Sequence, residues 1–166
     1  NVSPENYKQL WRETQQLLRH NGVHSLLYAY SPNTISSVEE FDRYYPGDEF
    51  VDILGVDIYN HSGNPAFTED LKNNLAIVQM KAALAGKPFA LTETGNTNFG
   101  EDPKWWTETL YPGIKNSGAA WLLLWRNARP SHYFATYPGE ISEEDFRNFA
   151  KLDEILFLDA VENITD

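Results

Sequence analysis

Cysteine is absent from this sequence, and histidine and methionine are rare, with four copies and one copy. Without thiols, the chain can form neither disulfide bonds nor thiolate nucleophiles. No CxxC or HExxH motif is present, so a protein-bound zinc site is not expected. A run of 18 or more apolar residues is also missing, so no helical membrane span is expected, and no segment has the pattern of a signal peptide.

Basic residues are scarce as well. The chain carries 13 Lys and Arg against 24 Asp and Glu, a formal net charge of −11. Nucleic acids and anionic membrane surfaces are bound through basic patches, so neither is expected as a partner, whereas a neutral or cationic small partner fits. The 166 residues are 42% hydrophobic and 14% aromatic, which is typical of one globular domain with a real core.

What the sequence does contain is a regular alternation of helical patterns and short apolar runs. One helix begins at Ser3-Pro4, and a second follows the capping pair Ser37 and Glu40. A long helix is predicted from near Thr68 to a C-cap at Gly86, another from Asp102-Pro103 to about Gly118, and a last one after Ser142. Between them lie four apolar runs, at residues 25–30, 51–59, 89–92 and 119–125. Nearly continuous apolar runs are typical of parallel strands that are buried on both faces.

Alternating strands and helices leave two α/β architectures open, a doubly wound sheet or part of a (β/α)8 barrel. No GxGxxG motif or P-loop follows any run, which disfavours the nucleotide-binding sheet. Polar residues follow each run instead, as in a barrel, where the C-terminal ends of all strands face one site: Ser31 and Asn33, Asp57 and Tyr59, Glu93 and Asn96, Arg126 and Asn127.

Four strand–helix units make half a barrel, since a complete one takes about 250 residues. The side chains that would face the barrel interior are one of two alternating sets. They are either the set Leu26, Tyr28, Ile53, Val56, Leu91 and Leu123 or the residues that alternate with it.

The motifs around these runs resemble glycoside hydrolase family 26, which consists mainly of endo-β-1,4-mannanases with a (β/α)8 barrel. LLYAYSPN is similar to its fifth strand, VDILGVDIY to the sixth, FALTETG to the seventh and AAWLLLWRN to the eighth, and YYPGDEFVD and EEDFRNFAKLDEILFLDAV are similar to the lead-in to the sixth strand and to the closing segment. The resemblance covers essentially the whole chain. It implies that residues 1–166 are the C-terminal half of a single catalytic barrel domain whose N-terminal half is not in this chain.

The resemblance also implies an activity, the retaining cleavage of β-1,4-mannosidic bonds in mannan-type polysaccharides by double displacement. Glu93 matches the family's nucleophile, and Tyr59 matches the tyrosine whose phenol hydrogen-bonds that nucleophile. A retaining glycosidase needs a second carboxyl group about 5–5.5 Å away as acid and base. In the family this is a glutamate that follows a histidine at the end of the fourth strand. The chain contains no His-Glu pair, so the partner of Glu93 is expected outside it.

Five further residues are candidates for binding the sugar: Trp125, Asp57, Arg126, Asn127 and His132. The ring of Trp125 would be an apolar platform under the sugar, or else a core tryptophan. Asp57 would bind a sugar hydroxyl or satisfy backbone donors, and Arg126 would reach the sugar or form a structural ion pair. Trp105 and Trp106 are instead predicted to pack between helix and barrel.

Other functions remain open on the same scaffold. A β-1,3-xylanase or a mixed-linkage β-glucanase would use the same strands, and a non-catalytic carbohydrate-binding barrel module would keep the aromatic residues without the chemistry. No metal and no organic cofactor is implied. The expected partners are a neutral polysaccharide or oligosaccharide and the missing half of the barrel, and the resemblance implies a secreted, cell-surface or periplasmic protein.

Overall fold

The structure is a computed structural model that describes residues 2–97, 100–130 and 132–162. Helices and strands alternate along the chain as the sequence predicts. Their order is α1 (Pro4–His20), β1 (Ala29–Tyr30), α2 (Val38–Tyr44), the 3-10 helix η1 (Asp48–Phe50), β2 (Ile53–Asn60), α3 (Asn64–Ala85), β3 (Phe89–Asn96), the π-helix η2 (Trp105–Leu110), α4 (Tyr111–Ile114), β4 (Leu122–Leu124), α5 (Glu143–Phe149) and α6 (Leu158–Glu162).

The ends of several elements differ from the predictions. Helix α3 starts at Asn64 and not near Thr68, because Gly63 at its N-cap has a φ of 87° and a proline follows in the first turn. It ends as predicted, with Gly86 in the left-handed conformation. The helix predicted from Asp102 consists of η2 and α4, with a proline in the first turn of α4, where its missing N–H interrupts the hydrogen-bond pattern.

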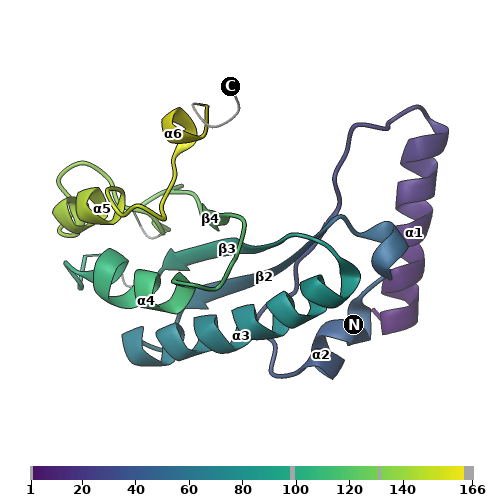
Figure 1. The fold of residues 1–166 in the computed structure, drawn as a ribbon, viewed down its shortest axis with the longest axis horizontal. Coiled ribbons are helices and arrows are strands. Elements are labelled where there is room, and N and C mark those ends of the chain that lie inside the picture. Colours follow the sequence, from purple (N-terminus) through teal and green to yellow (C-terminus); the bar gives the residue numbers. More distant parts are fainter. Residues whose placement is uncertain (1, 98–99, 131, 163–166) are drawn as a thin grey trace.

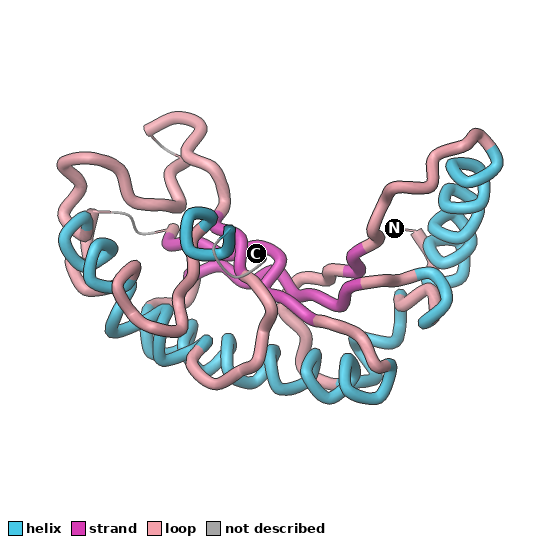
Figure 2. The backbone as a smooth tube through the Cα atoms, turned by 45° about the horizontal axis from the view of Figure 1, so that its top comes forward, coloured by secondary structure: helices cyan, strands magenta, loops and turns pink. Residues whose placement is uncertain are grey.

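All four strands are parallel, and their order in the sheet, β1-β2-β3-β4, is their order in the chain. Parallel crossovers are right-handed, so a sheet that grows in one direction carries its connecting helices on one face. A doubly wound sheet reverses direction and is covered on both faces. Figures 1 and 2 show the curved sheet with α3 running along one side of it. The strand order therefore decides between the two open architectures in favour of a barrel segment.

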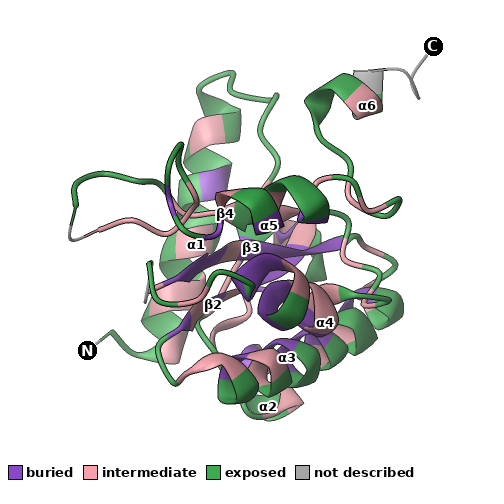
Figure 3. Ribbon diagram, turned by 90° about the vertical axis from the view of Figure 1, so that its left-hand side faces the viewer, coloured by how far each residue is buried: buried purple, intermediate pink, exposed green. Residues whose placement is uncertain are grey.

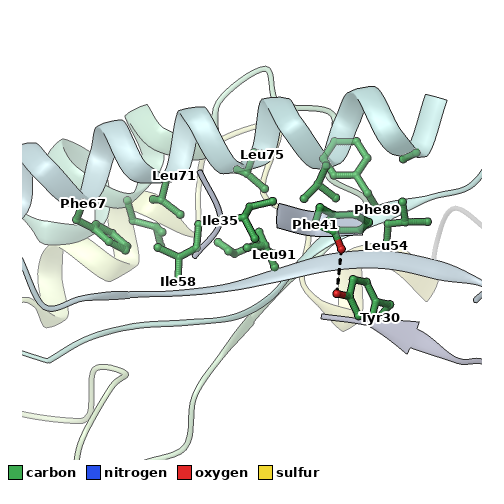
Figure 4. Packing of buried hydrophobic residues seen from close by; sticks show 14 of the residues in the cluster. Tyr30, Ile35, Phe41, Leu54, Ile58, Phe67, Leu71, Leu75, Phe89 and Leu91 are labelled. Atoms are coloured by element: carbon green, nitrogen blue, oxygen red, sulfur yellow. Dashed lines mark hydrogen bonds between the residues drawn. The ribbon is translucent and has the colours of Figure 1, made fainter. Parts of the chain in front are cut away.

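The hydrophobic core lies between this helix layer and one face of the central strands (Figure 4). From the sheet it receives Leu54, Val56, Ile58 and Leu91, and from α3 it receives Phe67, Leu71, Leu75 and Val78, all 2% exposed or less. Figure 3 shows β2 and β3 buried along most of their length. Side chains alternate across a strand, so the residues between them, Gly55, Asp57 and Tyr59, face the opposite side of the sheet.

That opposite face is less well covered in this chain. Ala29 in β1, which pairs with Ile53, is exposed, and Trp121 and Leu123 at β4 are 40% and 42% exposed. The apolar runs at 25–30 and 119–125 form strands of only two and three residues, because each lies at an edge of the described sheet with a single neighbouring strand. The expectation of strands buried on both faces therefore holds for β2 and β3 only in part, and fails for β4.

The C-terminal segment returns to the helix layer and is fastened there by hydrogen bonds. Asp145, which is 2% exposed, accepts bonds from the backbone N–H groups of Trp106 and Thr107, each at 3.0 Å. The indole N–H of Trp106 donates to Ser142 Oγ at 3.0 Å. Trp105 and Trp106 are 1% and 0% exposed, so the prediction that both are packing residues is confirmed: Trp105 stacks on Phe67 of α3, and Trp106 packs against Phe146 and Phe149 of α5.

Candidate active site

Glu93 reaches the uncovered face of the sheet through a β-bulge. Val56 pairs with Leu91 and Asp57 pairs with Glu93, so Thr92 is an extra residue in β3. Two residues apart on a regular strand, Leu91 and Glu93 would point to the same side, toward the helices. The extra residue turns the Glu93 side chain to the face that carries Asp57. The bulge thus decides that the carboxylate points into the concave side of the sheet rather than into the core.

Gly55 on β2 makes room for this bulge. A Cβ atom at that position would collide with the side chain of Thr92. The Thr92 hydroxyl donates to the carbonyl of Val56 at 3.0 Å and also contacts the hydroxyl of Ser31. Ser31 in turn donates to Asp57 Oδ1 at 2.6 Å. The bulge residue is therefore the middle of a polar chain that links the ends of β1, β2 and β3.

Tyr59 is the hydrogen-bond donor to the predicted nucleophile. Its hydroxyl donates to Glu93 Oε2 at 2.7 Å, and both side chains are half-buried. Burial raises the pKa of the Tyr59 phenol far above its ordinary value, and the hydrogen bond to Glu93 and the charges of Glu93 and Asp57 raise it further. The phenol therefore keeps its proton near neutral pH, and Tyr59 is the donor in its hydrogen bond with Glu93.

Asp57 lies beside this pair. Burial raises the pKa of its carboxyl group above the usual value, the hydroxyls of Ser31 and Thr92 lower it in part, and the negative charge of Glu93 raises it again. Its backbone N–H donates to the carbonyl of Pro32 at 2.9 Å. Asp57 is thus fixed at two points to the loop after β1, and both of its fixed contacts are structural.

The segment after β4 lies against the end of β3. Trp125 is half-buried, and its backbone N–H donates to the carbonyl of Thr94 at 2.8 Å. Arg126 is exposed and forms no ion pair with any described residue, so the structural ion pair considered for it is not formed in this part of the chain.

Asn127 is turned into its own loop. Its Oδ1 atom accepts from the backbone N–H groups of Phe134 and Ala135 at 2.9 and 3.0 Å, and its Nδ2 atom donates to the carbonyl of Ala135 at 2.7 Å. His132 packs edge-on against the ring of Phe134, with the ring centroids 4.7 Å apart. Sugar binding by either residue stays a prediction, and for Asn127 the observed contacts favour a structural role.

The structure brings Asp57, Tyr59 and Glu93 together and places Trp125 beside the same strand. Sequence reasoning did not assign to Thr92 and Phe134 the role of holding these groups in place. The signal for both was a glycine within a strand, because such a glycine marks a bulge or a close approach of another chain segment. Gly55 faces Thr92 and Gly95 faces Phe134.

Metal sites and membrane spans were searched over the described residues. In residues 2–97, 100–130 and 132–162, no three His, Asp or Glu side chains gather as they would around a metal ion. None of the helices described there is both long and apolar enough to cross a membrane. That the chemistry uses no metal or cofactor stays a prediction.

Comparison with known proteins points to one family. The sequence model of glycosyl hydrolase family 26 matches residues 1–112. A mannan endo-1,4-beta-mannosidase of Bifidobacterium adolescentis is 31% identical over 170 residues, an alignment that covers 90% of this chain and 17% of that protein.

Solved structures agree. A family 26 beta-mannanase from Bacteroides ovatus superimposes with a TM-score of 0.90 at 43% identity, covering 95% of this chain and 46% of that one. A modular endo-beta-1,4-mannanase from Cellulomonas fimi gives a TM-score of 0.84 at 33% identity, covering 94% and 37%. The chain therefore spans less than half the length of these relatives and corresponds to a part of a (β/α)8 barrel.

Proposed function

This chain belongs to glycosyl hydrolase family 26, and on that premise we propose that it is the C-terminal half of one catalytic barrel domain that cleaves β-1,4-mannosidic bonds with retention. The names of its relatives, among them mannanases from three bacterial genera, support mannan as the substrate. The observation that carries the proposal is the 2.7 Å hydrogen bond from Tyr59 to Glu93 at the C-terminal edge of a parallel sheet. In barrel enzymes this edge holds the catalytic residues.

In double displacement, Glu93 acts as the nucleophile, and a second carboxyl group acts first as the acid and then as the base. The Glu93 carboxylate attacks the anomeric carbon, and a carbon–oxygen bond forms as the glycosidic bond breaks. The leaving oxygen takes a proton from an acid in the upstream half of the barrel. The same group then removes a proton from water, which attacks the anomeric carbon and releases Glu93. Tyr59 donates a hydrogen bond to the free carboxylate and orients it before the first step and after the second.

The remaining candidates are proposed to bind substrate around this centre. Trp125 would support the apolar face of the sugar, and Asp57, Arg126 and His132 would bind its hydroxyl groups. The exposed guanidinium of Arg126, without an ionic partner among the described residues, supports such a role. We also propose that the complete protein is secreted, periplasmic or on the cell surface, because polymeric substrates are met there.

Product analysis on the complete enzyme tests the proposed function. Mannan and galactomannan should be cleaved to short oligosaccharides whose newly formed ends keep the β configuration, as judged by NMR early in the reaction. Cleavage of β-1,3-xylan or mixed-linkage β-glucan in place of mannan would favour those alternatives. Binding of mannan without any cleavage, together with an upstream half that lacks a His-Glu pair, would favour a binding module.

Replacement of Trp125 by alanine should lower kcat/KM on mannan about a hundredfold. An aromatic ring of this size carries about 150–250 Å² of surface, and each factor of ten in rate is about 1.4 kcal/mol. The N–H that bonds Thr94 belongs to the backbone and is retained in the variant. Steady-state kinetics on mannohexaose would measure the effect.

Trp121→Ala is the matched control for this variant. It removes the same ring from the opposite end of β4, where the side chain is 40% exposed. We expect it to leave kcat/KM close to that of the wild type at temperatures at which both are folded. If Trp125→Ala lost activity only in parallel with its melting temperature, and regained it on cooling, the ring would be structural.

A further inference from the structure

The loop after β4 is closed on itself by a single side chain. Asn127 bonds the backbone of residues 134 and 135 through both ends of its amide group, in three hydrogen bonds of 2.7 to 3.0 Å. We call this set of bonds the Asn127 clamp. Inside the loop, Ala128 N–H donates to the carbonyl of His132 at 3.0 Å. The amide thus satisfies backbone groups that an exposed loop would otherwise leave to water.

The clamp places Phe134 on the end of β3. Its carbonyl accepts from Asn96 N–H at 3.4 Å. Its side chain lies directly over Gly95, where an added Cβ atom would come within 2.6 Å of Phe134 Cβ and 3.0 Å of Cδ1. Real Cβ atoms essentially never approach so closely, so only glycine at position 95 allows Phe134 to sit there.

In this position over Gly95, the ring of Phe134 packs against the ring of Tyr59. The two centroids are 5.2 Å apart with an interplanar angle of 64°, an edge-to-face contact. Tyr59 pairs with Gly95 in the register of β2 and β3, so the phenol and the glycine that Phe134 covers are adjacent in the sheet. The centroid of the Tyr59 ring also lies 5.9 Å from that of His61. Phe134 therefore restricts the swing of the side chain whose hydroxyl reaches Glu93.

We infer that Phe134 and the Asn127 clamp are positioning elements for the nucleophile: they hold Tyr59 in the orientation in which its hydroxyl bonds Glu93. The inference rests on the proposed function for its kinetic consequence, but its geometric part stands on these contacts alone. The side chain of Phe134 has no polar group to offer the reaction, so it acts through Tyr59, whose ring it contacts. It also accounts for the otherwise unexplained glycine in the TETG motif.

A double-mutant cycle in the complete enzyme separates this role from a general effect on folding. Phe134→Ala should lower kcat/KM on mannohexaose about tenfold, and Tyr59→Phe at least as much, because each loses or weakens a hydrogen bond to a charged group. In the Tyr59→Phe background, Phe134→Ala should cost less than about twofold, since the interaction through which it acts is already gone. Independent, multiplicative losses would overturn the inference.

A structural readout does not depend on activity. In crystal structures of Phe134→Ala and of Gly95→Ala, which expels the ring from its seat, the Tyr59 hydroxyl should lie more than about 3.5 Å from Glu93 Oε2, beyond hydrogen-bond range. An intact hydrogen bond in both variants would refute the inference even if the enzyme cleaved no mannan. A displaced tyrosine in an enzyme inactive on mannan would support the inference and refute the proposed substrate.

Tyr133→Ala is the matched control. Tyr133 precedes Phe134 in the same loop but packs on Tyr137, with centroids 5.0 Å apart. It should leave the Tyr59–Glu93 hydrogen bond and kcat/KM on mannohexaose as in the wild type. Asn127→Asp keeps the acceptor oxygen but replaces the donor to Ala135. Its kcat/KM on mannohexaose should therefore lie between those of the wild type and Asn127→Ala.

Discussion

Turnover of mannan by the complete enzyme should fall by at least about 10⁵-fold when Glu93 is replaced by alanine, since removal of a catalytic nucleophile costs losses of this order. Without the carboxylate no glycosyl–enzyme intermediate can form, and water at the same face has no general base in place. The fold should be nearly unaffected. Glu93 is half-buried on the open face of the sheet, and the core on the other face, built on Leu91, does not include it. Kinetics and thermal unfolding on the same preparation would measure both.

Azide should restore part of the activity of Glu93→Ala toward an aryl β-mannoside with a good leaving group. A small anion fits into the space vacated by the carboxylate and attacks the same face of the anomeric carbon. The product should be the α-mannosyl azide, which NMR identifies. Wild-type turnover by Glu93→Ala, or rescue that gives the β-azide, would remove Glu93 from the role of nucleophile.

Glu101→Ala is the appropriate control for Glu93→Ala. Glu101 is an exposed glutamate in the connection between β3 and η2. Its replacement changes the net charge by the same amount without touching the sheet. Wild-type kinetics are expected, so a loss of activity in this variant would indicate that charge, and not the nucleophile, is responsible for the effect at position 93.

Residues 1–166 expressed alone should show no mannanase activity and should not behave as a stable monomer. In the described part of the chain, β1 and β4 are the two edges of the sheet, and the outer side of each has no neighbouring strand. Unpaired edges invite association with other chains. The face that a closed barrel would fill leaves Trp121 and Leu123 40% and 42% exposed. The nucleophile would also have no acid partner, because the chain contains no His-Glu pair.

Sedimentation velocity and a mannanase assay on these 166 residues test that expectation. Adding the separately produced upstream half of the barrel should restore both a defined size and activity. The same complementation with Glu93→Ala in the C-terminal piece should restore the size but not the activity. A well-folded, active monomer of the 166 residues alone would show that the half-barrel interpretation and the argument about the missing acid are both wrong.

Local rules in the sequence predicted the features that depend on neighbouring residues. Ser3 caps α1 and Ser37 caps α2 by accepting the predicted backbone N–H three residues on, each at 3.2 Å. Gly86 ends α3 because it adopts the left-handed conformation that other residues disfavour. The Glu40 carboxylate differs from the predicted capping pair with Ser37, because it accepts from the backbone N–H of Ser36 and not from that of Ser37.

Motif resemblance predicted the family, which the comparisons confirm, and the contact between Tyr59 and Glu93, which the structure contains. The motifs could not predict which side chains of each strand face the helices and which face the barrel interior. Both alternating sets were apolar, and the set containing Val56 and Leu91 was considered for the barrel interior. The structure places those two side chains against α3, fully buried.

The tertiary structure decided three matters that no local pattern contains. The strand order, and with it the barrel rather than the doubly wound sheet, depends on which strands pair across long distances in the chain. The side to which Glu93 points depends on one unpaired residue, Thr92, and on the room that Gly55 leaves for it. The hydrogen bonding of Asn127 to its own loop depends on the path of that loop, which brings Ala135 back to the Asn127 side chain. Each is a contact between segments at least seven residues apart, whereas capping, helix ends and periodicity are set within a few residues.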